Sequence, residues 1–222
     1  MRPPFTPEQF FDVFRRYNDA VWPAQFLLLA IGIVVAASAY RANARRSTRS
    51  AQVALALLAV LWLWAGIAYH KAFFAQLTQA GEIFGSLFIA EAGLLLLCLW
   101  QSDAPFTRAS HAGTVVGSIL LVYALAVYPA LTFVLGHRYP AMPTFGTPCP
   151  TTIFTFGIFC LLPASIPRFA MAIPILWAFI GSSAAISLDV LADAGLLVAA
   201  LAAVFVIHQK SVHHTHRESR HA

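Results

Sequence analysis

Residues 51–70 read AQVALALLAVLWLWAGIAYH, an apolar run with no acidic residue, lysine or arginine. A helix needs about 20 such residues to cross the ~30 Å hydrocarbon core of a membrane, where every backbone group must be hydrogen-bonded internally. Of the 222 residues in the chain, 59% are hydrophobic and 10% are charged, against roughly 25% charged residues in soluble domains. The sequence therefore predicts an all-α integral membrane protein.

Six further stretches resemble this run in length and composition. Together they predict one domain, 21–208, built as a bundle of seven transmembrane helices. The expected spans are 21–40, 51–70, 80–100, 113–136, 150–167, 169–188 and 189–208.

Lysine and arginine are distributed unevenly between the two sides of these spans. Nine of the 14 lie on one side, and four of these are arginines in the first connection, 41–49, which has no acidic residue. Because positively charged loops are usually retained in the cytoplasm, the sequence predicts an outside N-terminus and a cytoplasmic C-terminus.

Two segments flank the predicted bundle. Residues 1–20 predict a short amphipathic helix on the outer membrane surface, because Thr6 and Gln9 fit a capping box and apolar residues then recur at helical spacing. Packing of this helix on the bundle is an equally good interpretation. The basic, histidine-rich segment 209–222 is expected to form a disordered cytoplasmic tail.

Glu91 is the residue that most directly indicates a functional site. A carboxylate within an apolar helix costs several kcal/mol unless it is protonated or paired, so its side chain should face the bundle interior. It could carry protons, or it could be a structural acid hydrogen-bonded to Tyr123 or Tyr128. Asp193 is a second acid at the level of an apolar span.

Other polar residues gather at the outer ends of the predicted spans. With Glu91 and Asp193 they form a candidate substrate- or proton-binding site that opens away from the cytoplasm. These residues are His70, Lys71, Glu82, His137, Arg138, Tyr139 and Thr151. The proline-rich loop 136–150 is expected to be an ordered lid, and the helix start that follows it, at Thr151, is expected to offer free N–H groups to an anion or a carbonyl ligand.

A metal site is the alternative interpretation of the same region. His70, His137 and Cys149 could together hold a zinc ion. Such a site would make the protein similar to the seven-helix ceramidase-like superfamily of membrane hydrolases, although that superfamily uses three histidines and this chain offers two at the outer side. No lysine lies within the last predicted span, which excludes a retinal protein.

Three stretches resemble a bacterial inner-membrane family of unknown function. They are 7–19 (PEQFFDVFRRYND), 81–96 (GEIFGSLFIAEAGLLL) and 139–159 (YPAMPTFGTPCPTTIFTFGIF). The resemblance implies a multi-pass inner-membrane protein and no particular activity.

We therefore expect a transporter or channel for a small solute or ion, because acids within the spans need no metal to explain them. A metal-dependent hydrolase and an accessory subunit without chemistry of its own are the alternatives. The expected partners are the lipid bilayer and the transported solute or ion. Nucleic acid is not expected, and homo-oligomerisation is left open.

Overall fold

The computed structural model describes residues 4–100, 108–162, 166–188 and 190–218, and this part of the chain is built from helices. The α-helices are α1 Pro7–Val21, α2 Ala24–Arg45, α3 Thr48–Trp64, α4 Ala80–Trp100, α5 His111–Val122, α6 Tyr128–Val134, α7 Pro148–Leu161, α8 Ala172–Leu188 and α9 Ala194–Glu218. Short π-helices, η1 Ala65–Lys71 and η3 Tyr123–Val127, extend α3 and join α5 to α6. Three 3₁₀ turns, η2 Phe74–Gln76, η4 Arg168–Met171 and η5 Leu191–Asp193, complete the chain path.

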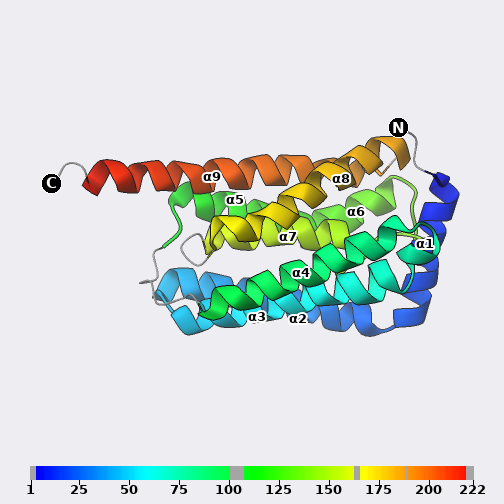
Figure 1. Ribbon diagram of the computed structural model, residues 1–222, viewed down its shortest axis with the longest axis horizontal. Coiled ribbons are helices and arrows are strands. Elements are labelled where there is room, and N and C mark those ends of the chain that lie inside the picture. Colours follow the sequence, from blue (N-terminus) through cyan, green and yellow to red (C-terminus); the bar gives the residue numbers. More distant parts are fainter. Residues whose placement is uncertain (1–3, 101–107, 163–165, 189, 219–222) are drawn as a thin grey trace.

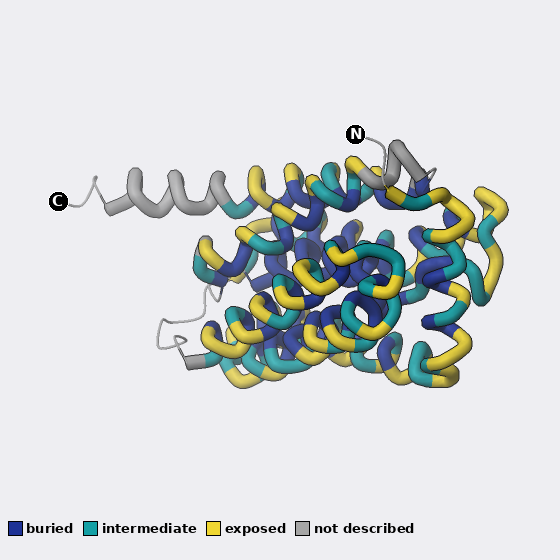
Figure 2. The backbone as a smooth tube through the Cα atoms, turned by 45° about the vertical axis from the view of Figure 1, so that its right-hand side comes forward, coloured by how far each residue is buried: buried dark blue, intermediate teal, exposed yellow. Residues whose placement is uncertain are grey.

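The long helices run up and down in two layers (Figure 1). One layer contains α2, α3 and α4, and the other contains α5 with α6, α7, α8 and α9. The layers meet where α7 contacts α2 and α3 and where α8 contacts α4. Figure 2 shows the buried residues concentrated between the helices and the exposed residues on the outer faces.

Helix α7 occupies the centre of the bundle. All of its residues except Cys149 are buried, and it packs against α5, α8 and α9 of its own layer as well as α2 and α3 of the other. Its apolar sequence on every side explains this position, because a helix that is hydrophobic all round is stable only when it is surrounded by other apolar groups.

Helix α1 lies across one end of the bundle, roughly perpendicular to the long helices (Figure 1). Its capping box is present as predicted, with Gln9 N–H donating to Thr6 Oγ1 and Thr6 N–H donating to Gln9 Oε1. The face that contains Val13, Phe14 and Tyr17 is buried against an aromatic cluster formed with Tyr69 and Phe74. The segment thus packs on the bundle, and its place at the outer membrane surface stays a prediction.

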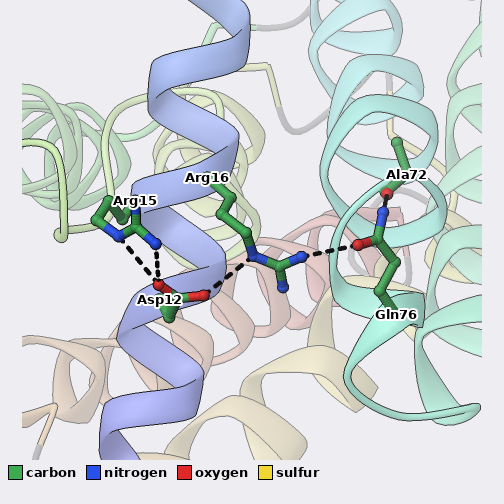
Figure 3. Close-up of polar contacts among 5 residues, drawn as sticks. All are labelled: Asp12, Arg15, Arg16, Ala72 and Gln76. Carbon is green, nitrogen blue, oxygen red and sulfur yellow. Dashed lines mark hydrogen bonds and ion pairs between the residues drawn. The ribbon is translucent and has the colours of Figure 1, made fainter.

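Arg16 connects α1 to the turn between α3 and α4. Its guanidinium contacts Asp12 at 3.1 Å and donates to Gln76 Oε1 at 2.7 Å, and Gln76 in turn donates to the Ala72 carbonyl (Figure 3). Arg15 pairs with the other oxygen of Asp12. The bond between Arg16 and Gln76 thus ties α1 to the turn that follows α3.

Glycines allow close helix contacts within each layer. A Cβ atom at Gly66 would lie 2.9 Å from the Gly85 carbonyl oxygen, and one at Gly117 would lie 2.8 Å from the Gly157 carbonyl oxygen. Small residues at such positions let helix backbones approach closely, as in helix pairs within membranes.

Four helices of the described chain are long and apolar enough to cross a membrane. They are Ala24–Arg45, Thr48–Gln76, Ala80–Leu99 and His111–Val134. The apolar helices Pro148–Leu161, Phe169–Ser183 and Ala194–Ile207 are shorter. Helices thus lie in each of the seven predicted regions, but among the described residues only the first four are both long enough and apolar enough for a membrane span.

Two boundaries differ from those expected. Helix α7 ends at Leu161, before Pro163, whereas the span was expected to run to residue 167; residues 163–165 lie outside the described part. Residues 209–218, expected to be a disordered tail, continue α9. This stretch has no glycine or proline, the residues that most often end a helix.

Candidate functional site

Glu91 lies on the buried face of α4, and its side chain is 0% exposed. Neither carboxyl oxygen has a hydrogen-bond partner within the described residues. Its predicted position in the bundle interior is therefore confirmed. A buried polar atom without a partner costs roughly 1–3 kcal/mol, and more if the group is charged, so this residue is kept at a cost to stability.

The two tyrosines considered as partners of Glu91 have other roles. The Tyr128 hydroxyl donates to Oδ1 of Asp193, and the Tyr123 hydroxyl donates to the carbonyl of Ala192 at 2.9 Å. Both bonds tie the η3–α6 region to the start of α9. Asp193 is 4% exposed, so the second acid is also buried, but it has a donor and Glu91 has none among the described residues.

His70 lies in the π-helix η1, at the end of the bundle that α1 covers. The side chain is 1% exposed, and neither ring nitrogen has a hydrogen-bond partner in the described chain. Its imidazole is surrounded by aromatic rings, with centroids 4.7 Å away in Phe88 and 5.0 Å away in Trp177. Single π-turns within helices occur often at functional sites.

A cavity of about 40 Å³ lies next to His70, beneath α1. Half of its lining consists of aromatic side chains: Phe10, Phe14, Tyr69, Phe74 and Trp177. By the same measure of volume one water needs about 10–15 Å³, so the cavity has room for roughly three water-sized groups.

The remaining lining comes from His70 and from the start of α7. Thr147, Pro148 and Cys149 contribute there, together with Pro143 from the preceding loop. Asp193 does not line the cavity but interacts electrostatically with Cys149, which does. The cavity thus brings together two predicted site residues, His70 and Cys149, and a third, Asp193, interacts with the second of them.

The start of α7 has fewer free N–H groups than the sequence predicted. Pro148 and Pro150 have no N–H, and the amide of Thr151 donates to the Thr147 carbonyl. Cys149 therefore supplies the only amide donor among the first three residues of α7. The predicted anion site at this helix start is a poor match, although the buried Thr151 hydroxyl has no partner in the described part of the chain.

Asn18 holds the proline-rich loop over the cavity. Its Nδ2 donates to the carbonyls of Pro140 at 2.7 Å and Met142 at 2.8 Å, and its Oδ1 accepts from the hydroxyl of Thr144. The side chain is 0% exposed. Sequence analysis missed this residue, although Asn18 follows Phe14 by four residues and so falls on the apolar face of α1.

Lys71 and Glu82 lie at the periphery of the bundle. Lys71 Nζ pairs with Glu82 Oε2 at 2.8 Å, and the Glu82 side chain is 60% exposed. Neither side chain lines the cavity, so the structure does not bring them together with His70 and Cys149.

The loop residues His137, Arg138 and Tyr139 also lie away from the cavity. His137 stacks on Phe11 with ring centroids 3.9 Å apart, Arg138 lies over the ring of Phe133, and Tyr139 is 46% exposed. None of the three lines the cavity.

Among the described residues, no group of three histidine, cysteine or acidic side chains is placed to hold a metal ion. His137 packs on α1, whereas His70 and Cys149 face the cavity. The predicted zinc trio of His70, His137 and Cys149 is therefore not assembled.

These features define a helical-bundle protein with several membrane-length helices and an interior that contains unpartnered polar groups. The chain belongs to the DUF6064 family, a family of unknown function, whose pattern matches residues 7–218. No curated protein and no solved structure matches the chain. The expected membership of a family without an assigned activity is thus confirmed.

Proposed function

We propose that this protein is a multi-pass protein of the bacterial inner membrane that moves a small solute or cation across it, with Glu91 as the proton-carrying group. The observation that carries the proposal is the fully buried Glu91 carboxyl without a partner among the described residues. Ionisable residues within membrane spans are rare and mark transport pathways and proton relays. In this proposal the chain crosses the membrane seven times, with its N-terminus outside.

The position of the cavity supports a path from the outer end towards Glu91. Phe88 contacts His70, which lines the cavity, and Phe88 precedes Glu91 by three residues on α4. Three residues correspond to about 4.5 Å along a helix. Glu91 therefore lies about one helical turn deeper than the cavity, on the same side of α4 as the α8 contact at Trp177.

The two layers provide the parts that would move. Glycine contacts hold α4 tightly to the end of α3 in one layer and α5 tightly to α7 in the other. Glu91 and His70 belong to the first layer and Trp177 to the second. Rocking of one helical group against another is the usual way in which transporters open a buried site to alternate sides.

Glu91→Gln tests the role of the carboxyl, and Glu82→Gln is the matched control on the same helix, since Glu82 is exposed and paired with Lys71. Proteoliposomes containing a trapped pH indicator would be given a proton gradient with sodium, potassium or ammonium on the opposite side. We expect flux from the wild-type protein and from Glu82→Gln, and at least a tenfold lower flux from Glu91→Gln. Equal flux from Glu91→Gln would overturn the role of this residue, and wild-type flux no higher than in empty liposomes would favour an accessory role instead.

The hydrolase alternative receives no support from the described residues, because they contain no three-ligand group for a catalytic metal. Transport requires only the buried acid, the cavity and the two helical layers.

A further inference from the structure

We propose that the cavity beneath α1 binds a small protonated amine, such as ammonium or methylammonium, through aromatic ring faces and the unprotonated nitrogen of His70. This inference rests on the proposed function and names the class of its substrate. His70 lines the cavity and is more than nine-tenths buried. Neither of its ring nitrogens has a hydrogen-bond partner in the described chain.

The lining favours a cation over an anion. Five aromatic side chains line the cavity, and no lysine or arginine of the described residues does. The face of an aromatic ring carries negative potential and attracts ammonium groups, most strongly when the site is dry. Asp193, which interacts with Cys149 of the lining and accepts from Tyr128, adds negative charge near the start of α7 and opposes the positive end of that helix.

The lining contains hydrogen-bond acceptors for a ligand, beside the donor Nε1–H of Trp177, which has no partner among the described residues. The Thr147 hydroxyl already donates to the Thr144 carbonyl at 2.7 Å, so only its lone pairs remain for a ligand. A neutral imidazole offers one unprotonated nitrogen as an acceptor, and both nitrogens of His70 are free of partners within the described residues. Such a set matches a ligand that donates N–H bonds.

Size restricts the ligand further. A cavity of about 40 Å³ accepts roughly three water-sized groups. Ammonium and methylammonium fit this space, whereas tetramethylammonium, with five non-hydrogen atoms and no N–H, does not. Potassium fits by size but cannot donate a hydrogen bond.

Equilibrium binding of radiolabelled methylammonium to the purified full-length protein, in ammonium-free buffer at neutral pH, tests the proposal. We expect saturable binding of one methylammonium per chain, competed by ammonium and not by tetramethylammonium. No saturable binding, or competition by potassium as strong as that by ammonium, would overturn the proposal. These comparisons use the wild-type protein alone and do not depend on how variants fold.

Variants then place the ligand in the cavity. Trp177→Leu and His70→Phe should weaken binding roughly fivefold to thirtyfold, the range expected for losing one cation–π or charge-assisted contact. Phe179→Leu, on the same helix as Trp177 but 58% exposed, should bind like the wild type. Unchanged binding in both cavity variants would exclude this cavity as the site.

The binding assay and the flux assay fail independently. Glu91→Gln should still bind methylammonium while it loses flux, because Glu91 does not line the cavity. Binding without any flux would contradict transport, and flux of another cation without methylammonium binding would contradict the assignment of the ligand.

Discussion

The Tyr128 hydroxyl donates a hydrogen bond to Oδ1 of Asp193, at 2.5 Å, and thereby joins α6 to the turn that precedes α9. Both side chains are buried. The bond connects the first residue of α6 to η5, the turn before α9, and both residues interact with Cys149 of the cavity wall.

Tyr128→Phe removes this donor and leaves a buried carboxyl without it. We expect a loss of about 1–3 kcal/mol in the free energy of unfolding, measured by denaturant titration in detergent. Asp193→Asn gives the second variant of a double-mutant cycle. Strictly additive effects of the two substitutions would contradict a direct energetic coupling between these residues.

Glu91→Leu should raise stability while it abolishes flux. The substitution replaces an unpartnered buried carboxyl with an apolar side chain of similar size, so we expect a gain of roughly 1–3 kcal/mol, read as a higher melting temperature. Glu82→Leu, at an exposed ion pair, should change the melting temperature little. A lower melting temperature for Glu91→Leu would indicate that the carboxyl has a stabilising partner.

Asn18→Asp keeps the acceptor for Thr144 but removes the N–H groups that hold the carbonyls of Pro140 and Met142. The loop should then open more often over the cavity, so we expect faster amide hydrogen exchange in residues 141–147. Gln9→Ala, at the exposed start of the same helix, serves as the control, because it weakens the capping box without reaching the loop. Equal exchange in Asn18→Asp and wild type would show that other contacts hold the loop.

Gly117→Ala should destabilise the bundle by about 1–3 kcal/mol, since the added Cβ would lie 2.8 Å from the backbone oxygen of Gly157. Gly93→Ala is the matched control: nothing lies within 4 Å of its added Cβ, and alanine favours helix over glycine by roughly 0.5–1 kcal/mol. Thermal unfolding of the two variants should therefore shift in opposite directions.

Tyr17 should make stability sensitive to alkaline pH. Burial raises the pKa of its hydroxyl to about 12, partly opposed by the hydrogen bond that Trp64 donates. The folded state thus favours the neutral phenol. The contribution of this phenol to the free energy of unfolding is complete below about pH 10 and is lost as pH rises towards 12. Between about pH 10 and pH 12, the free energy of unfolding should therefore fall by up to roughly 2–3 kcal/mol less in Tyr17→Phe than in the wild type. Parallel pH profiles would contradict this assignment.

The helices and the depth of polar residues could be predicted from the sequence, but the direction of most side chains around each helix could not. Residue spacing places Lys71 and Glu82 near the same end of neighbouring helices, and both are found there. Only the packed structure shows that they turn to each other at the surface. Glu91 was the exception, because the cost of exposing a carboxyl to lipid determines its direction without knowledge of the neighbours.

The cavity required contacts that are distant in sequence. Its wall combines α1, η1, η2, the loop before α7, the start of α7 and α8, and no local pattern indicates that these segments meet. Asn18 shows the same limit: its position on the apolar face of α1 could be recognised, but its partners lie more than 120 residues further along the chain.

Helix α7, at the centre of the bundle, is synthesised before some of the helices that enclose it. This helix has almost no side chain that faces outwards, and at 14 residues it is only about 21 Å long. Its neighbours include α8 and α9, which are synthesised after it. The ribosome therefore releases α7 when α2, α3 and α5 are present but α8 and α9 are not, and α9 completes the enclosure of α7.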